Sequence, residues 1–178
     1  MNPQSSKRWH RGCDRGFSLI ELLIVVAIIL IIAAIAIPNF LRAKIAANES
    51  SAANSVRKIA TAQVSYNAAF PTIGYAPALS NLGGPSGCVP SSTTACIIDF
   101  VLSSGTKDGY QFLTAAFVQG SGTINNSFVA SSAPQSYDVT GDRNFCVVTD
   151  GVLRFLGGSS GTPPAPDVAT CMTYITLQ

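Results

Sequence analysis

The chain begins with a polar, basic stretch that gives way at Gly16 to a nearly unbroken run of apolar residues. From Phe17 to Ile37, only Ser18 and Glu21 are polar among 21 residues. As an α-helix this run would measure about 31 Å, the thickness of the hydrocarbon core of a bilayer. The pattern therefore predicts a membrane-spanning helix over residues 17–37.

Beyond Pro38 the pattern becomes amphipathic. Apart from Pro38, glycine and proline are absent until Pro71, so we expect one helix from Ser18 to Ala69, about 78 Å long. Pro38 has no backbone N–H to donate and should bend or loosen this helix nearby. Apolar residues recur at helical spacing and predict a stripe facing a folded head. The stripe comprises Leu41, Ile45, Ala52, Val56, Ile59, Ala60 and Val64.

The rest of the chain is punctuated by glycine and proline and has shorter apolar segments. Pro71–Pro90 is expected to be a loop, followed by a short helix over Cys96–Ser103. In that helix, apolar side chains should turn inward. Strands are expected at Tyr110–Val118 and Ser127–Ser131. The inward set of the short helix is Ile97, Ile98, Phe100 and Val101.

A β-hairpin is predicted near residue 150, where Asp150-Gly151 separates the segments Phe145–Thr149 and Val152–Leu156. Asp-Gly favours a two-residue type I′ turn. That register would put Cys146, Val148, Leu153 and Phe155 on the face toward the long helix, and Thr149, Val152 and Arg154 on the other.

A short terminal strand is expected over Thr170–Leu177. The predicted fold class is therefore α+β, with a long N-terminal helix packed on an antiparallel sheet of about four strands.

The distribution of charge predicts the orientation of the apolar segment in the membrane. Lys7, Arg8, Arg11 and Arg15 precede it against the single acid Asp14, so the N-terminus should stay in the cytoplasm. Three interpretations fit the segment. The segment could be a cleaved secretory signal with a small-residue cleavage site at 34–36, or a plain membrane anchor. The third interpretation is a membrane helix that is cleaved at its N-terminus and then serves in assembly.

Glu21 separates these interpretations. An ionised group in a membrane helix costs about 2.5–3.5 kcal/mol at mid-bilayer, so a partner or a role must compensate. Cleavage before Phe17 would create such a partner, an α-ammonium group one helical turn away at the positive end of the helix dipole. Pairing between chains would fix their axial stagger. The alternative is a glutamate that reaches to the membrane interface.

The segment Gly16-Phe17-Ser18-Leu19-Ile20-Glu21, continued to Pro38-Asn39-Phe40, resembles the processing site of bacterial type IV pilins and pseudopilins. The resemblance implies cleavage after Gly16 by a prepilin peptidase, N-methylation of Phe17, and a role for Glu21 in assembly. It also implies a leader over 1–16, a membrane and assembly helix over 17–37, its amphipathic continuation over 38–70, and a β-rich head over 71–178.

The five cysteines divide between leader and head. Cys13 lies in the leader, and an even number outside the cytoplasm indicates two disulfides. Three pairings are open, of which the spacing favours Cys88–Cys96 with Cys146–Cys171. A zinc site is disfavoured because the chain has no Cys-x-x-Cys pair. In many pilins a C-terminal loop is fastened to the sheet, which supports the second pair.

Composition argues against an enzyme. Leader removal takes away the only histidine, His10, so a Ser-His-Asp triad or an imidazole metal site cannot form. Removing four of eleven basic and one of nine acidic residues leaves seven and eight, too few and too scattered for a nucleic-acid surface. We expect no catalytic residue, metal or cofactor; Asp138, Asp142 and Asp150 do not have EF-hand spacing.

Taken with the resemblance, these features predict a filament subunit. Its partners would be membrane lipid before assembly, the prepilin peptidase and methyltransferase, the pilus assembly machinery of the inner membrane, and further copies of itself. It would move from the inner membrane to an extracellular pilus for adhesion, motility or DNA uptake. The alternatives are a pseudopilin of a type II secretion system, or a membrane-tethered minor pilin acting as a binding module.

Overall fold

The computed structural model describes residues 16–158 and 161–177, in two compact units that divide between Asn39 and Phe40. The first unit consists of the N-terminal half of helix α1, which as a whole covers Leu19–Ala69. The second unit holds the rest of α1 and the head. The single 51-residue helix agrees with the sequence prediction, apart from its first residue.

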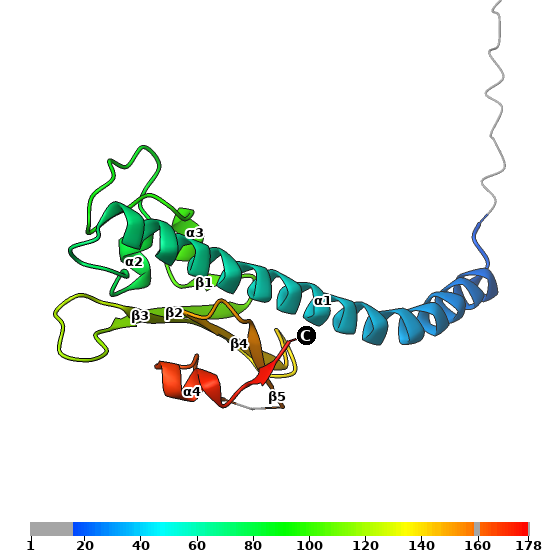
Figure 1. Cartoon of the computed structure of the whole chain (residues 1–178). Coiled ribbons are helices and arrows are strands. Elements are labelled where there is room, and N and C mark those ends of the chain that lie inside the picture. The colour runs from blue at the N-terminus through cyan, green and yellow to red at the C-terminus, as the bar shows by residue number, and fades with distance from the viewer. Residues whose placement is uncertain (1–15, 159–160, 178) are drawn as a thin grey trace, which may run out of the picture. The chain divides into compact units, whose positions relative to one another are not determined.

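The head contains one antiparallel sheet in which the strands follow chain order (Figure 1). Six strands form it instead of about four, because each edge carries an additional two-residue strand. Such short edges resist pairing with foreign strands. The strands are β1 Thr106–Lys107, β2 Tyr110–Phe117, β3 Ser127–Pro134, β4 Arg143–Val148, β5 Arg154–Gly157 and β6 Ile175–Thr176. The short helices are α2 Leu79–Leu82, α3 Phe100–Ser103 and α4 Val168–Met172.

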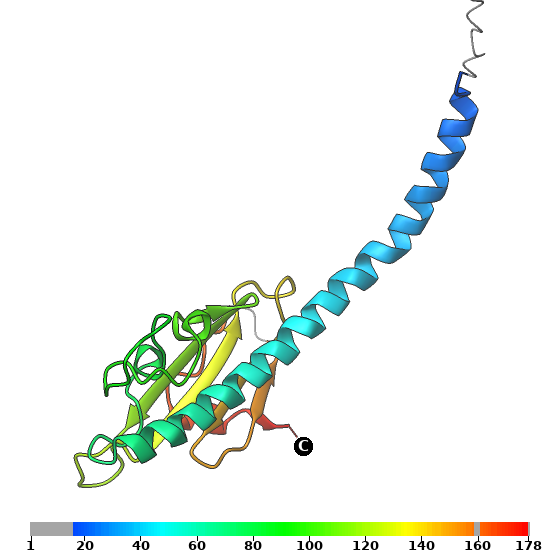
Figure 2. The same cartoon turned by 90° about the horizontal axis from the view of Figure 1, so that it is seen from above.

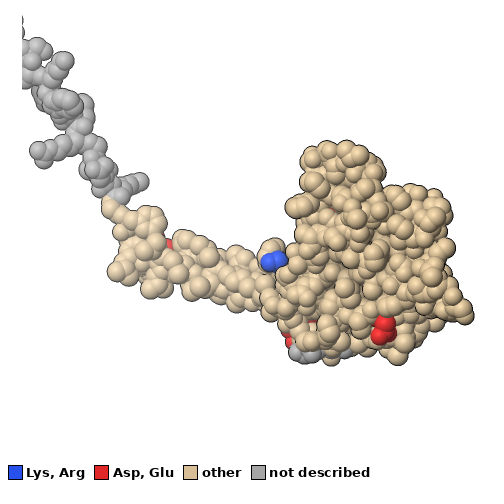
Figure 3. All heavy atoms as spheres, turned by 90° about the vertical axis from the view of Figure 1, so that its left-hand side faces the viewer, with Lys and Arg blue, Asp and Glu red and all other residues tan. Residues whose placement is uncertain are grey.

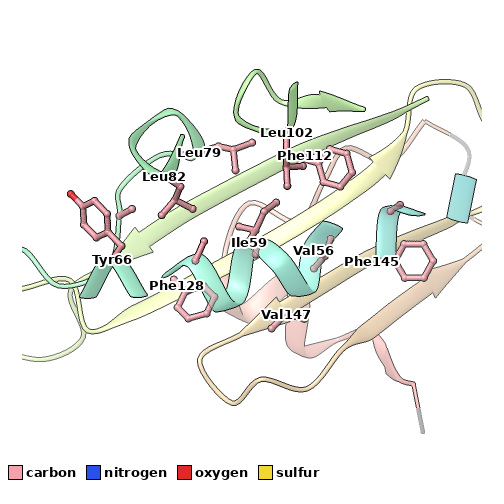
Figure 4. Packing of buried hydrophobic residues seen from close by; sticks show 14 of the residues in the cluster. Val56, Ile59, Tyr66, Leu79, Leu82, Leu102, Phe112, Phe128, Phe145 and Val147 are labelled. Atoms are coloured by element: carbon pink, nitrogen blue, oxygen red, sulfur yellow. The ribbon is translucent and has the colours of Figure 1, made fainter. Parts of the chain in front are cut away.

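Both faces of the sheet are covered. The part of α1 from Phe40 onward lies over one face, as Figure 2 shows from above, and packs Val56 and Ile59 against Phe112 and Phe128 (Figure 4). The C-terminal segment with α4 covers the other face. A second cluster of buried residues lies there: Val129, Cys146, Val148, Ala165, Cys171 and Tyr174.

The predicted hairpin register is wrong for β4. Cys146 pairs with Arg154, so a five-residue loop joins β4 and β5 in place of a two-residue turn. Its cause is the Asp150 carboxylate, which accepts from the backbone N–H of Val152 at 2.9 Å and from the Arg154 guanidinium at 3.1 Å. This one-residue slip exchanges the faces of β4. Cys146 and Val148 therefore face α4, while Leu153, Phe155 and Arg154 lie on the faces predicted for them.

The C-terminus also differs from its prediction. Residues 168–172 form α4, so Cys171 lies on a helix and only Ile175–Thr176 pairs as a strand. Asp167 caps α4 by accepting from the Thr170 N–H at 2.7 Å, a signal that favours helix over strand.

The apolar stripe of α1 and the inward set of the short helix need correction as well. Val64 and Leu41 are exposed, and Phe100 and Val101 point to solvent, while Leu102 is fully buried. Helix α3 begins only at Phe100 because Asp99 caps it.

Two disulfides fasten the head. The structure joins Cys146 to Cys171, which confirms the predicted pair, and joins Cys88 to Cys96. Cys146 and Cys171 are both completely buried, and their bond ties α4 to the centre of the sheet.

Loss of the Cys146–Cys171 bond should destabilise the head strongly. The bond closes a loop with a sequence separation of 25, and loop closure of that size is worth about 3–4 kcal/mol on the chain-entropy model. We expect Cys146→Ala/Cys171→Ala to lower the free energy of unfolding by that amount in urea titrations of the detergent-solubilised chain. Cys88→Ala/Cys96→Ala, which opens a loop of separation 8, should lose less; an equal or larger loss would contradict this reasoning.

A turn between β3 and β4 is tied to α1 by Glu49. This glutamate is 5% exposed, and its carboxylate accepts from the Asp142 N–H at 3.0 Å and from Nε of Arg143 at 2.8 Å. Asn48 adds a bond from its side-chain amide to the Thr140 carbonyl at 3.0 Å. Two side chains of one helix turn therefore hold residues 140–143 against α1.

Asp142 in this turn should make the stability of the head depend on pH. Burial, followed by the neighbouring Asp138 carboxyl, raises the pKa of Asp142. A pKa raised by folding means that protonation stabilises the fold, and this contribution is lost as the pH rises through the folded value. Asp142→Asn should therefore stabilise the head by about 0.5 kcal/mol at neutral pH and by nothing near pH 3, measured as urea midpoints.

Asp167→Asn serves as a control of opposite sign. The Thr170 N–H lowers the pKa of Asp167, so its contribution is present at neutral pH and is lost as the pH falls. The Asp142 prediction is wrong if both variants shift stability in the same direction at neutral pH.

Candidate processing and assembly site

The predicted cleavage residues lie at the start of α1. Gly16 and Phe17 precede the helix, Ser18 caps it, and Glu21 is its third residue. The Ser18 N–H donates to Oε2 of Glu21 at 2.9 Å, and the Leu22 N–H donates to the Ser18 carbonyl at 3.2 Å. Glu21 thereby satisfies a backbone donor that an α-helix leaves unpaired at its N-terminus.

This second use of Glu21 was missed at the level of sequence. The signal was present, because Ser18-Leu19-Ile20-Glu21 has the spacing of a capping box. The bond occupies Oε2 only; within the described residues, Oε1 of Glu21 accepts no hydrogen bond. One carboxylate oxygen can thus hold the helix start while the other receives a further donor.

Gly16 is open to its surroundings. A Cβ atom built on Gly16 meets nothing within 4 Å, and Phe17 is 74% exposed. No contact within residues 16–158 and 161–177 therefore requires glycine at this position. Residues 1–15, most of the predicted leader, lie outside the described residues.

The first unit offers an apolar surface on every side. Its large side chains, from Leu19 to Ile37, are 46–79% exposed within the chain. Figure 3 shows this segment without basic residues and with a single small acidic spot, consistent with Glu21 as its only charged residue. By length and composition the helix can cross a membrane. A helix that is apolar all round needs lipid or other helices to cover it.

Pro38 lies inside α1, about 26 Å along the helix from Glu21, so the two do not form one site. Because Pro38 has no N–H, the carbonyl four residues before it loses its helical partner. The Asn39 side-chain amide donates to the next carbonyl, that of Ile35, at 3.1 Å. A bend at Pro38 stays a prediction.

The remaining candidate residues do not gather into a second site. The four head cysteines form disulfides, and Asp150 binds Arg154 on a different loop from Asp138 and Asp142. In the described part of the chain, no group of three His, Cys, Asp or Glu side chains is placed to hold a metal ion.

Comparison with known proteins agrees with this geometry. Residues 11–37 match the family model of the prokaryotic N-terminal methylation motif. The type IV major pilin protein PilA of Myxococcus xanthus is 45% identical over 78 residues, which cover 40% of this chain and 36% of that protein. The type IV wide pilus major component PilA4 of Thermus thermophilus is 61% identical over 36 residues, covering 20% and 28%. No solved structure gives a significant match.

The motif and the helix define a chain with an N-terminal methylation signal, followed by a helix whose length and composition fit membrane anchoring. The two relatives then confirm the resemblance to type IV pilins. The long helix packed on an antiparallel sheet is also a pilin-like architecture. The chain spans about a third of the length of the curated relatives it matches.

Proposed function

We propose that this protein is a structural subunit of a type IV pilus. The observation that carries the proposal is the exposed Gly16-Phe17 junction directly before a capped helix that is apolar up to Ile37 apart from the carboxylate of Glu21. Its match to the N-terminal methylation motif supports cleavage after Gly16 and methylation of Phe17. The proposed parts are a leader over 1–16, an assembly helix over 17–37, its continuation over 38–70 and a head over 71–178.

Assembly follows from the same surfaces. Before assembly, lipid covers residues 17–37, with the N-terminus in the cytoplasm. In the filament, the equivalent helices of other copies replace lipid, and Oε1 of Glu21 receives the new ammonium group of Phe17 from a neighbouring copy. The pairing neutralises both charges in a medium of low dielectric constant, where an unpaired charge is costly. The assembly machinery supplies the energy for extrusion to the cell surface.

Substitution of Gly16 tests the processing step. Because the structure leaves open space for a side chain there, Gly16→Val should fold and insert normally but should not be cleaved. Ser18→Ala is the matched control and should be cleaved, since the backbone N–H at position 18 can still donate to the Glu21 carboxylate. Immunoblots of membranes would show the longer precursor for Gly16→Val alone. Normal cleavage of Gly16→Val would contradict the proposed site.

Location separates a pilus from a secretion pseudopilus. A pilus subunit should appear in filaments sheared from the cell surface. Processed protein found only in the cell envelope would favour a pseudopilin.

A further inference from the structure

The turn from Ser136 to Asp142 forms a rigid knob on the head. The Thr140 N–H donates to the Ser136 carbonyl at 2.9 Å, and Asn48 and Glu49 hold the turn to α1 as described above. Asp138 adopts a φ of 60° within it. At its tip Val139 is 66% exposed. A preorganised turn with an apolar tip loses little conformational entropy on docking.

The knob is also acidic. Asp138 and Asp142 lie close enough for their carboxyls to interact, and neither forms an ion pair with any Lys or Arg in the described residues. Oδ1 of Asp142 is buried without a hydrogen-bond partner. Two carboxyls held together in this way would be stabilised by a basic partner.

A groove of the complementary character lies elsewhere on the head, between α1 and the segment that leads into α3. Its volume is about 450 Å³. Arg57 and Lys58 form a basic rim, both exposed and both without an ion pair in the described part of the chain. One acidic residue, Asp99, also lines the groove, and its Oδ1 accepts from the Leu102 N–H at 2.9 Å. Ala62, Ile98 and Leu102 give it an apolar floor.

We propose that the knob of one copy docks into the groove of a second copy in the filament. This inference rests on the proposed pilus function. Val139 would lie against the apolar floor, and the carboxylates of Asp138 and Asp142 would face Arg57 and Lys58. Complementary charge of this kind selects the partner and its register.

The two surfaces cannot meet within one chain. The knob is held at the level of Asn48, whereas Arg57 and Thr61 are 9 and 13 residues further along α1, about 14 and 20 Å. Docking therefore requires a second copy displaced along the helix axis by about that distance.

Disulfide trapping tests the contact in filaments made of the full processed chain. Val139→Cys/Thr61→Cys should give a ladder of covalent multimers after oxidation, because a disulfide needs Cα atoms within about 7 Å. Each single variant should stay monomeric. Val139→Cys/Val152→Cys is the matched control, since Val152 is an exposed valine outside the groove, and it should also stay monomeric. Filaments of the Val139→Cys/Thr61→Cys variant that yield only monomer overturn the inference.

Charge reversal gives an independent result if the cysteine variants do not assemble. Lys58→Glu should lower the amount of sheared filament about tenfold, and Lys58→Glu/Asp138→Lys should restore most of it. Lys107→Glu, outside the groove, should change little. If Lys58→Glu and Lys107→Glu give equal filament yields, the inference is wrong while the proposed function still stands. If the unsubstituted protein never enters filaments, the proposed function fails and the inference fails with it.

Discussion

Replacing Glu21 by glutamine is expected to reduce the amount of this protein in filaments at least about tenfold, while the processed protein accumulates in the membrane. Glutamine keeps a side-chain oxygen that can accept from the Ser18 N–H, so the helix start is preserved. It removes the charge that would pair with the ammonium group of Phe17. A loss of about 1.4 kcal/mol per contact gives a factor of ten. Removing one partner of a buried ion pair costs about 3–5 kcal/mol, because the other charge is left buried without compensation.

The measurement is the ratio of sheared to membrane-bound protein on immunoblots. Glu21→Asp is the control that keeps the charge on a shorter side chain, and it should retain more filament than Glu21→Gln. If Glu21→Gln assembles like the unsubstituted protein, the capping bond is the only role of this residue, and charge pairing does not set the register.

Replacing Gln63 by leucine should strongly destabilise the head. Gln63 is fully buried, and its amide donates to the Ala76 carbonyl at 3.0 Å and to the Thr114 hydroxyl at 2.9 Å, while its oxygen accepts from the Ala76 N–H at 2.8 Å. Leucine would leave both backbone groups of Ala76 buried without partners. At about 1–3 kcal/mol for each group, the expected loss is roughly 2–6 kcal/mol.

The loss would be measured by urea unfolding of the detergent-solubilised chain, followed by near-ultraviolet circular dichroism. Gln111→Leu makes the same chemical change at an exposed position of β2 and should stay within about 0.5 kcal/mol of the unsubstituted protein. Similar values for Gln63→Leu and Gln111→Leu would show that the bonds to Ala76 contribute little.

The N-terminal half of this molecule can be predicted well from its sequence. From Phe17 to Ala69 glycine is absent and Pro38 is the one proline, so both the apolar and the amphipathic part of this range indicate a helix. The long helix and the α+β class therefore depend on local signals.

The head is less predictable because its register depends on side chains that bind backbone. Asp-Gly at 150–151 favours a two-residue turn, yet the Asp150 carboxylate binds the Val152 N–H and Arg154, and the resulting longer loop reverses the faces of β4. Asp167 similarly caps a helix where periodicity indicated a strand. A shift of one residue in strand pairing moves every side chain of the strand to the opposite face of the sheet.

The apolar stripe of α1 also did not predict which of its polar residues are buried. Glu49 and Gln63 are buried because distant segments, residues 142–143 and 76, supply their partners. A hydrophobic pattern places such residues on the solvent side, since the partners that make burial favourable are 13 to 94 residues away.

The intact mass of this protein in filaments sheared from cells tests the central claim most directly. The account predicts a chain that begins at Phe17, carries one added methyl group, and lacks four hydrogens because of the two disulfides. A chain that begins at Ile37, or one that still contains Trp9, would contradict it.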